Sequence, residues 1–216
     1  MSVRVEVARP PALCTAAPDA RTAVLVVDVV RATSTLVTAL ASGALGVRPE
    51  AEVDAARAKA AATGALLAGE RGGVALPGFD LGNSPREMTA AAVGRRELVL
   101  TTTNGTRAVL AGAGAGAVLA VALLNAEASC RAVAEGWALA DGRPAERVVV
   151  VCAGSGGEVC ADDVAAAGCL VGNLALMAAA ELDDSARLAV ALFDTWRADL
   201  PGLLARSLSG RKLTDV

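Results

Sequence analysis

The sequence predicts an α/β fold, a three-layer α/β/α domain built on a largely parallel or mixed sheet, and two observations support this prediction. Short apolar runs without polar alternation recur along the chain, as in strands that are buried on both faces of a sheet. Helix-like segments separate these runs, and the alternation of strands with helices is the α/β pattern. Since the chain has 216 residues, of which 54% are hydrophobic, we expect a single domain over residues 1–216.

The individual elements follow from these runs. Strands are expected at the apolar runs that end at Asp28, Thr102 and Cys152, and in the run around Leu119. The N-terminal segment "MSVRVEVARPP" alternates as a strand does and lacks the long apolar region of a secretory signal. The helices expected between the strands are residues 34–44, 53–63, 85–93, 126–140 and 162–180.

Three segments share one layout, in which a buried strand leads into a polar loop and then into a helix. They are "VLVVDVVRATSTLVTALASG", "ELVLTTTNGTRAVLAG" and "RVVVVCAGSGGEVCADDVAAAGCLVG". Ligands of open α/β sheets bind at the carboxyl ends of the strands, so we expect the three loops to meet at one site. The shared layout also leaves open an internal duplication.

The composition argues against several classes of protein. A net charge of -3 and only four aromatic residues make nucleic acid an unsuitable partner. No apolar run approaches the roughly 20 residues that a bilayer span needs, so we expect no membrane insertion and a cytoplasmic location. The five cysteines include no C-x-x-C pair, which favours small buried side chains over disulfides or zinc ligands. The Ala-rich helices could face a core or a partner, which leaves a homo-oligomer open.

The chain contains no histidine. This excludes Ser-His-Asp and Cys-His triads and histidine-liganded zinc sites. Catalysis must then use carboxylates, hydroxyls, Lys, Arg, Cys or a bound metal, and oxygen ligands suit a hard cation such as Mg²⁺.

Asp28 is the leading candidate for a functional acid. It ends a buried strand, where a carboxylate is costly unless it meets a metal, an arginine or several backbone donors. The alternative is that Asp28 only caps the following turn. A haloacid-dehalogenase phosphatase has a second Asp two residues later, whereas this chain has Val30, so that type of aspartyl-phosphate mechanism is not supported.

Cationic and hydroxyl side chains follow the predicted strand ends. Arg31 and Thr33 come directly after Asp28, where a helix start and a guanidinium favour an anion site, although Thr33 or Ser34 could be an ordinary helix cap. In "GERGG", Glu70 and Arg71 lie at a predicted strand end with glycines that let the backbone approach a ligand. A surface ion pair on a turn is the alternative for these two residues.

Two further polar segments, "NSPREMT" and "TTTNGTR", contain candidate ligands for an anion. The first predicts a capping box, with Ser84 as the N-cap and Glu87 three residues later, which leaves Asn83 and Arg86 for a ligand. The second places Asn104 and Arg107 after a buried strand. Asp163, in the first turn of the long helix, could bind a metal or only complement the helix dipole.

Two glycine-rich segments suggest phosphate loops. "AGAGAGA" at 111–117 follows a helix, so we predict a helix end and a turn. "AGSGGEV" at 153–159 follows a strand, but the third glycine of a dinucleotide fingerprint falls on Val159. A nucleotide-binding domain therefore remains a minor alternative.

Taken together, these motifs resemble the 2-phosphosulfolactate phosphatase family. The similar segments are "VVDVVRATSTLVTALASGA" (26–44), "GERGGVALPGFDLGNSPREMT" (69–89), "LVLTTTNGTRA" (98–108), "LLNAEA" (123–128) and "VVVVCAGSGGEVCADDVAAAGCLV" (148–171), and their order fits from about residue 3 to about residue 212. The resemblance implies an α/β enzyme that uses Mg²⁺ to hydrolyse 2-phospho-3-sulfolactate to 3-sulfolactate and phosphate, a step of coenzyme M biosynthesis.

The chain departs from the family pattern at two places. The family's Ser-x-His-Gly-like stretch reads "SLSGRKLTDV" here, so that Ser209 stands where the histidine is usual and its role cannot be carried over. The family's Glu-Asp pair is Asp162-Asp163 here, and the metal role is expected of Asp163 rather than of Asp162.

We therefore expect a phosphatase with a small anionic phospho-acid as substrate. The catalytic residues expected are Asp28, Glu70 and Arg31, and the metal ligands expected are Asp28, Glu70 and Asp163. The substrate-binding residues expected are Arg31, Thr33, Arg71, Asn83, Arg86, Asn104 and Arg107. A phosphatase of the same fold for another phospho-acid and a non-catalytic anion-binding protein remain alternatives.

Overall fold

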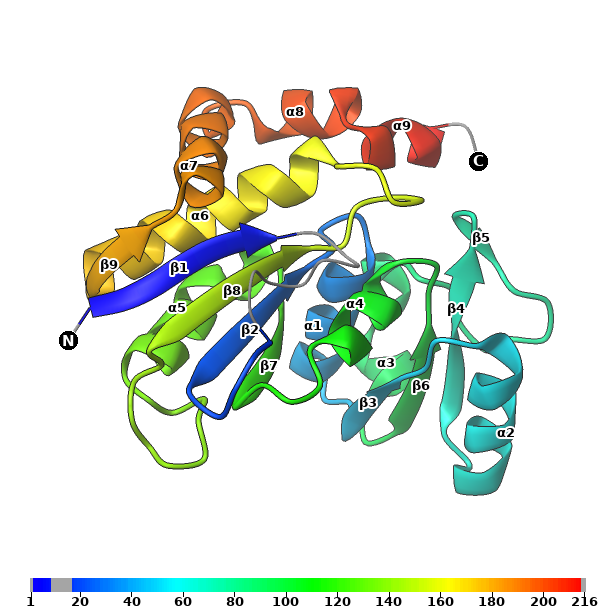
Figure 1. Cartoon of the computed structure of the whole chain (residues 1–216). Helices are drawn as coiled ribbons and strands as arrows, with labels where there is room; N and C mark the ends of the chain where they lie inside the picture. The colour runs from blue at the N-terminus through cyan, green and yellow to red at the C-terminus, as the bar shows by residue number, and fades with distance from the viewer. Residues whose placement is uncertain (1, 9–16, 215–216) are drawn as a thin grey trace.

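A computed structural model describes residues 2–8 and 17–214 of the chain. Its first sheet, sheet A, has five parallel strands in the order β7-β2-β8-β1-β9 (Figure 1). The strands are β1 (Ser2–Ala8), β2 (Thr22–Val27), β7 (Ala117–Val121), β8 (Arg147–Cys152) and β9 (Ala179–Leu182). The alternating N-terminal segment is thus a strand, as predicted, while Pro10 and Cys14 lie outside the described residues.

A second sheet, sheet B, has the order β3-β6-β4-β5 and is parallel except for its last strand pair. Its strands are β3 (Gly46–Pro49), β4 (Leu66–Arg71), β5 (Val74–Ala75) and β6 (Glu97–Thr101). The prediction of an α/β fold with a largely parallel sheet is confirmed, and the strands are divided between two sheets. No pattern within a single strand distinguishes the two, because pairing is decided by residues far apart in the sequence.

Helices cover both faces of each sheet, as the unbroken apolar runs predicted. They are α1 (Ala32–Ala41), α2 (Val53–Thr63), α3 (Ala90–Val93), α4 (Gly105–Ala111), α5 (Ala126–Ala134), α6 (Ala161–Met177), α7 (Asp184–Trp196), α8 (Leu200–Arg206) and α9 (Leu208–Thr214), with the 3₁₀ turns η1 (Pro85–Glu87) and η2 (Leu123–Asn125). Sheet A packs against α5, α6 and α7 on one face and against α4 on the other. Sheet B packs against α1 and α3 on one face and against α2 on the other.

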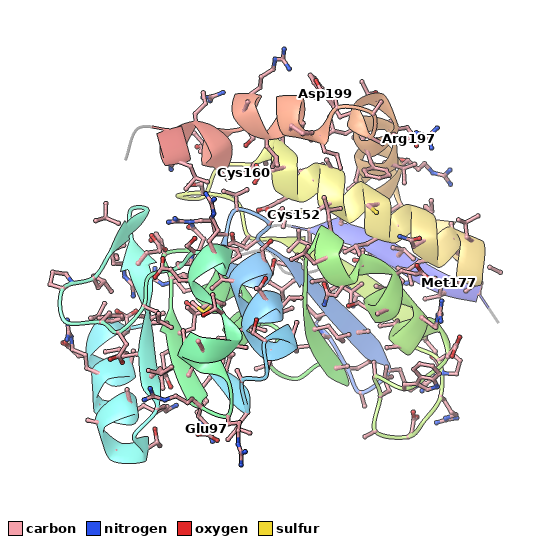
Figure 2. All side chains as sticks on the ribbon, turned by 180° about the vertical axis from the view of Figure 1, so that it is seen from behind. Glu97, Cys152, Cys160, Met177, Arg197 and Asp199 are labelled. Carbon is pink, nitrogen blue, oxygen red and sulfur yellow. The ribbon has the colours of Figure 1, made fainter. Side chains whose placement is uncertain are left out.

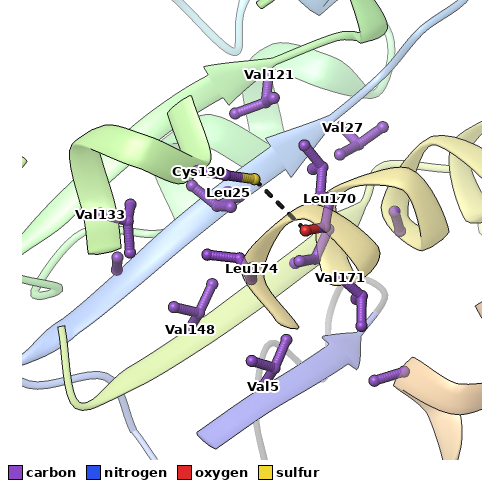
Figure 3. Close-up of a cluster of buried hydrophobic side chains, with 14 of the residues drawn as sticks. Val5, Leu25, Val27, Val121, Cys130, Val133, Val148, Leu170, Val171 and Leu174 are labelled. Atoms are coloured by element: carbon purple, nitrogen blue, oxygen red, sulfur yellow. Dashed lines mark hydrogen bonds between the residues drawn. The ribbon is translucent and has the colours of Figure 1, made fainter. Parts of the chain in front are cut away.

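Strand β2 shows why the core of sheet A has two sides. Leu25 and Val27 point to the side that holds α5 and α6, whereas Val24 and Val26 point to the side that holds α4. On the first side, Cys130 of α5 donates its thiol hydrogen to the carbonyl oxygen of Leu170 on α6 at 3.5 Å (Figure 3). Burial on both faces fixes β2, and with it the position of the residue that follows, Asp28.

The predicted helix over residues 85–93 is wrong in part. The structure has η1 and α3 instead, and Met88 between them is buried in the core of sheet B. Ser84 is the N-cap residue of η1, as predicted, but its side chain makes no capping hydrogen bond. The capping box itself is wrong, because Glu87 accepts from the amide of Gly82 at 2.6 Å. Packing of Met88 against the sheet accompanies the interruption of the helix.

Two other predicted helices extend too far. The helix over 126–140 ends at Ala134, and the helix over 162–180 ends at Met177. The residues after Met177 form β9, which pairs with β1 at the edge of sheet A. Alanine favours helices intrinsically, but here the strand pairing overrides that preference. The segment 111–117 is a helix end and a turn, as predicted.

Within residues 2–8 and 17–214, no helix combines the length and the apolar character that crossing a bilayer requires.

Candidate active site

The loops that follow four strands surround a pocket with a volume of about 150 Å³. Those after β2 and β8 belong to sheet A, and those after β4 and β6 belong to sheet B. The lining residues are Asp28, Val30 and Arg31; Glu70, Gly72 and Gly73; Asn83; Thr103 and Asn104; Gly154, Ser155 and Gly156; and Ser209, Lys212 and Leu213. The three loops that the sequence expected to meet do meet, and the loop after β4 and helix α9 join them.

Glu70 is held by backbone donors of its own sheet. One carboxylate oxygen accepts from the amide of Thr103 at 2.7 Å, and the other accepts from the amide of Gly73 at 2.6 Å and from the Thr103 hydroxyl at 3.3 Å. The side chain is 6% exposed. Glu70 therefore joins the loops after β4 and β6 and presents a fixed carboxylate to the pocket.

Asp28 is equally buried but has fewer donors. Its Oδ1 accepts from the amide of Ala32 at 3.1 Å. Burial raises the pKa of Asp28 to about 6; the Ala32 amide opposes this shift, and the nearby charges of Asp162 and Glu70 add to it. A carboxyl group with such a pKa changes its protonation state close to neutral pH, as general acids and bases do.

Asp163 lies behind the pocket and not in its lining. Its two oxygens accept from the amides of Val29 and Gly154, each at 2.9 Å, and so tie the loop after β2 to the loop after β8. Burial raises the pKa of Asp163 well above its ordinary value, and the charges of Asp28 and Asp162 contribute. The structure thus gives Asp163 a positioning contact, and its predicted role as a metal ligand stays a prediction.

Asp162 is the least satisfied acid near the site. Both of its carboxylate oxygens are buried without a hydrogen-bond partner among the described residues. Burial raises the pKa of Asp162, although the nearby hydroxyls of Ser207 and Ser209 oppose the shift. A buried carboxylate that nearby hydroxyls compensate only in part is costly, and such costs are characteristic of functional sites.

The glycine-rich loop after β8 uses its amides within the protein. Gly154 donates to Asp163, Ser155 donates to the carbonyl of Glu158, and Gly156 donates to Oδ1 of Asn104 at 3.2 Å. A loop that cradles phosphates needs amides that point at the ligand. The nucleotide-binding alternative therefore loses its main support, and Asn104 is left with its Nδ2 group as the donor for a ligand.

Arg31 is the one predicted arginine in the described lining of the pocket. Its guanidinium donates to the carbonyl of Gly73 at 2.7 Å, which holds it across the pocket from its own loop. Asn83 also lies in the lining, is 5% exposed, and has an Oδ1 without a hydrogen-bond partner among the described residues.

Four predicted substrate-binding residues lie outside the lining. Thr33 exchanges hydrogen bonds with the backbone of Asp28. Arg71 donates to the carbonyls of Glu70 and Ala51 and to the Thr101 hydroxyl.

The other two arginines are further from the pocket. Arg107 is exposed and pairs with Glu52 at 3.1 Å, and Arg86 is exposed on η1. The predicted four-arginine clamp is therefore not assembled around this pocket. The sequence places arginines after strand ends, but it does not show which way their long side chains turn.

A larger hollow, of about 400 Å³, is lined by Arg21, Glu146 and Met177 among others. Its two arginines are already paired, because Arg21 contacts Asp141 and Glu146 at 2.9 and 3.1 Å and Arg143 contacts Asp141 at 3.0 Å. The smaller pocket at the strand ends is thus the better candidate for an active site, since it combines an unpaired buried oxygen, Oδ1 of Asn83, with titratable groups.

Comparison with known proteins assigns the chain to a family. Residues 10–216 match the family model described as 2-phosphosulpholactate phosphatase. A protein of Deinococcus radiodurans named "Probable 2-phosphosulfolactate phosphatase" is 45% identical over 170 residues, which are 78% of this chain and 68% of that protein. A protein of Gloeobacter violaceus with the same name is 40% identical over 91% of this chain and 78% of that protein. Another of the same name, from Thermus thermophilus, is 42% identical over 78% of this chain and 68% of that protein. The chain belongs to the 2-phosphosulfolactate phosphatase family.

This family is one of phosphoric monoester hydrolases, and the position at which the resemblance led us to expect a histidine can be located in the fold. Ser209, which occupies that position, lies on α9 in the pocket wall. Lys212, one turn later on the same helix, also lines the pocket and was not predicted as a site residue. The only signal for Lys212 in the sequence was its place near this motif.

The oxygen-rich lining fits the Mg²⁺ ion that we expected from the sequence. Mg²⁺ prefers oxygen ligands and is often held by one or two carboxylates, with substrate oxygens and water completing its coordination. Asp28, Glu70 and the unpartnered Oδ1 of Asn83 are such oxygens. Within residues 2–8 and 17–214, no three His, Cys, Asp or Glu side chains are grouped to hold one ion, so the acids alone form no closed metal cage there.

The cysteines near this pocket are not suited to be nucleophiles. Cys152 and Cys160 flank the loop between β8 and α6, and in Figure 2 they lie between Asp199 at the top and Glu97 at the bottom. Burial raises the pKa of Cys152 well above its ordinary value and that of Cys160 to about 11. Both thiols therefore stay protonated at neutral pH, and the thiolate is the reactive form.

Proposed function

We propose that this chain is a Mg²⁺-dependent phosphatase that hydrolyses 2-phospho-3-sulfolactate to 3-sulfolactate and phosphate. Membership of the family supports the substrate, and one observation on the site carries the chemistry. Asp28, Glu70 and the unpartnered carbonyl oxygen of Asn83 line the same small pocket at the strand ends of both sheets. This is a set of oxygen ligands beside an acid whose pKa is raised to about 6.

The charges of the pocket support a requirement for a divalent cation. Its described lining contains two acids, Asp28 and Glu70, and two cations, Arg31 and Lys212. These charges cancel, whereas the proposed substrate carries a phosphate, a sulfonate and a carboxylate. A divalent cation held by Asp28, Glu70 and Asn83 would supply positive charge for the phosphoryl oxygens and would lower the pKa of a bound water.

The side chains of the site then have separate tasks. The Arg31 guanidinium binds an oxygen of the phosphoryl group and stabilises the negative charge that develops on it. Asn104 offers its Nδ2 donor to the substrate, since its Oδ1 is engaged by Gly156. Glu70 keeps the loops after β4 and β6 at a fixed distance from Asp28 through its bonds to Gly73 and Thr103.

Hydrolysis breaks the bond between phosphorus and the ester oxygen, which leaves as the hydroxyl of 3-sulfolactate after it takes up a proton. Two roles of Asp28 are compatible with its place in the pocket. It can accept a proton from the attacking water, or its carboxylate can attack phosphorus and form an acyl phosphate that water then cleaves. The stereochemistry at phosphorus separates them, because one direct attack by water inverts the configuration of an isotopically chiral phosphoryl group, whereas two successive displacements through an acyl phosphate retain it.

A phosphate-release assay tests the function itself. The purified chain is incubated with 2-phospho-3-sulfolactate, 2-phospholactate and phosphoglycolate, each with Mg²⁺ or with a chelator. We expect Mg²⁺-dependent turnover with the highest kcat/KM for 2-phospho-3-sulfolactate. A higher kcat/KM for another phospho-acid would reassign the substrate, full activity in chelator would exclude the metal, and anion binding without any turnover would identify a binding protein.

The proposal includes a cytoplasmic location, as the sequence predicts, and a role in coenzyme M biosynthesis, as the family resemblance implies. Cell fractionation with an antibody tests the first. Loss of 3-sulfolactate, with accumulation of its phosphate ester, after deletion of the gene tests the second.

A further inference from the structure

Lys212 of helix α9 is fixed at the edge of the pocket by a loop of sheet A. Its ammonium group donates to the hydroxyl of Ser155 at 2.6 Å, and both residues line the pocket. Ser155 belongs to the loop after β8, whose amides are engaged by Asp163 and Asn104. The ammonium group of a flexible lysine is thus attached to a loop that is itself held in place.

Helix α9 is anchored by buried contacts of its own. Ser207, which is 2% exposed, accepts from the amide of Gly210 at 2.9 Å and donates to the carbonyl of Leu204 at 2.9 Å. Gly210 lies so close to the Leu204 carbonyl that a Cβ atom could not be accommodated there. These contacts fix the helix against α8, and therefore they also fix the side of α9 that faces the pocket.

The two cations of the described lining are attached to different walls. Arg31 is held by Gly73 in the turn between β4 and β5, next to the buried acids. Lys212 is held by Ser155 on the wall formed by sheet A, and it is exposed to solvent, whereas Asp28 and Glu70 are 7% and 6% exposed. A substrate whose phosphoryl group reaches the acids would have its remaining groups near the exposed edge.

We infer that Lys212 binds a second anionic group of the substrate, a carboxylate or a sulfonate, and so determines specificity for phosphate esters that carry additional negative charge. This inference rests on the proposed phosphatase function and adds to it the residue that selects the substrate class. Lysine suits this role because its ammonium group is a point charge that does not require the planar geometry of a guanidinium fork. The Ser155 hydroxyl keeps the ammonium at the pocket edge before the substrate arrives.

The test compares kcat/KM of the wild type and Lys212→Met on two matched esters. One is 2-phospholactate, which has a carboxylate beside the phosphate, and the other is isopropyl phosphate, which has the same carbon skeleton and no second anion. We expect the substitution to lower kcat/KM for 2-phospholactate by about 5- to 10-fold, mainly through KM, and to leave isopropyl phosphate unchanged within about 2-fold. The diagnostic quantity is thus the ratio of kcat/KM for 2-phospholactate to kcat/KM for isopropyl phosphate.

The second lysine of the chain provides a matched control. Lys59 on α2 pairs with Glu50 outside the pocket, and Lys59→Met removes the same charge from the protein. We expect Lys59→Met to behave as the wild type on both esters, and Lys212→Arg to recover part of the lost selectivity. If Lys212→Met lowered kcat/KM equally for both esters, the inference would be overturned, since Lys212 would then act on the phosphoryl group or on the fold. An unchanged kcat/KM for both esters would also overturn it.

A binding measurement separates this inference from the proposed function. Sulfoacetate, which carries a carboxylate and a sulfonate but no phosphate, is titrated calorimetrically into the wild type, Lys212→Met and Lys59→Met in the presence of Mg²⁺. We expect weaker binding for Lys212→Met alone. If the wild type hydrolyses none of the esters, the proposed function fails, and this titration still decides the role of Lys212: equal affinities in all three proteins would overturn it.

Discussion

Asp28 and Glu70 are both buried acids at strand ends, but they differ in their hydrogen bonds and in the charges around them. Glu70, on sheet B, accepts three hydrogen bonds from Gly73 and Thr103. Asp28, on sheet A, has the Ala32 amide on one oxygen and lies near the charge of Asp162, which has no hydrogen-bond partner of its own among the described residues. Two acids with similar burial can thus have different roles. The hydrogen-bonded carboxylate of Glu70 holds the loops in place, whereas the carboxylate of Asp28, which burial destabilises, takes part in the chemistry.

The largest expected effect is the loss of turnover in Asp28→Asn. Asparagine keeps an oxygen for the Ala32 amide but can neither accept a proton from water nor attack phosphorus, so we expect kcat to fall by about 10³-fold or more. The fold should persist, as circular dichroism can check. Activity within 10-fold of the wild type would remove Asp28 from the centre of the mechanism.

The next effect concerns stability and pH in the metal-free protein. The unfolded Asp28 has an ordinary pKa of 3.8, and the folded one has a pKa of about 6. Below pH 3.8 both forms are protonated and there is no penalty. As the pH rises from 4 to 6, Asp28 ionises first in the unfolded protein, so the free energy of unfolding falls by up to about 3 kcal/mol.

Asp28→Asn removes this penalty, and so the sign of its effect can be predicted. In chelator, the free energy of unfolding of Asp28→Asn minus that of the wild type should grow as the pH rises from 4.5 to 7. Urea titrations at four pH values measure it. A difference that stays constant with pH would mean that Asp28 is no less stable as an anion in the folded protein than in the unfolded one.

Glu70→Gln should change the free energy of unfolding in the opposite direction, so that the variant is less stable than the wild type. A glutamine has one acceptor oxygen, so its amide nitrogen must face a donor, either the Gly73 amide or the Thr103 amide. We expect a loss of about 1–3 kcal/mol in the free energy of unfolding at pH 7, together with lower activity as the loops after β4 and β6 separate. If Glu70→Gln proved as stable as the wild type, the distinction between the two acids would be lost.

The residues of this site also show which of its features the sequence could predict. The apolar runs and the loops that follow them were local signals, and they predicted that Asp28, Arg31, Asn83 and Asn104 lie at one site. The division into two sheets and the strand β9 depend on pairing between distant segments, and Lys212 reaches the pocket only because α9 packs against α8. The bonds of Asp163 to Val29 and Gly154 join residues up to 134 positions apart, so no local pattern predicts them.

The smallest expected effect separates the arginines that follow the two acids. Arg31 follows Asp28 and lines the pocket, whereas Arg71 follows Glu70 and donates to Ala51, Glu70 and Thr101 at 2.7–2.9 Å. Arg31→Gln should therefore raise KM by about 10-fold. Arg71→Gln should cost about 1–2 kcal/mol of stability and change KM by less than about 2-fold at a temperature well below unfolding. A KM for Arg71→Gln that rises as much as that for Arg31→Gln would show that the Arg71 side chain turns to the substrate when it binds, and the original expectation of more than one arginine at the anion would then hold.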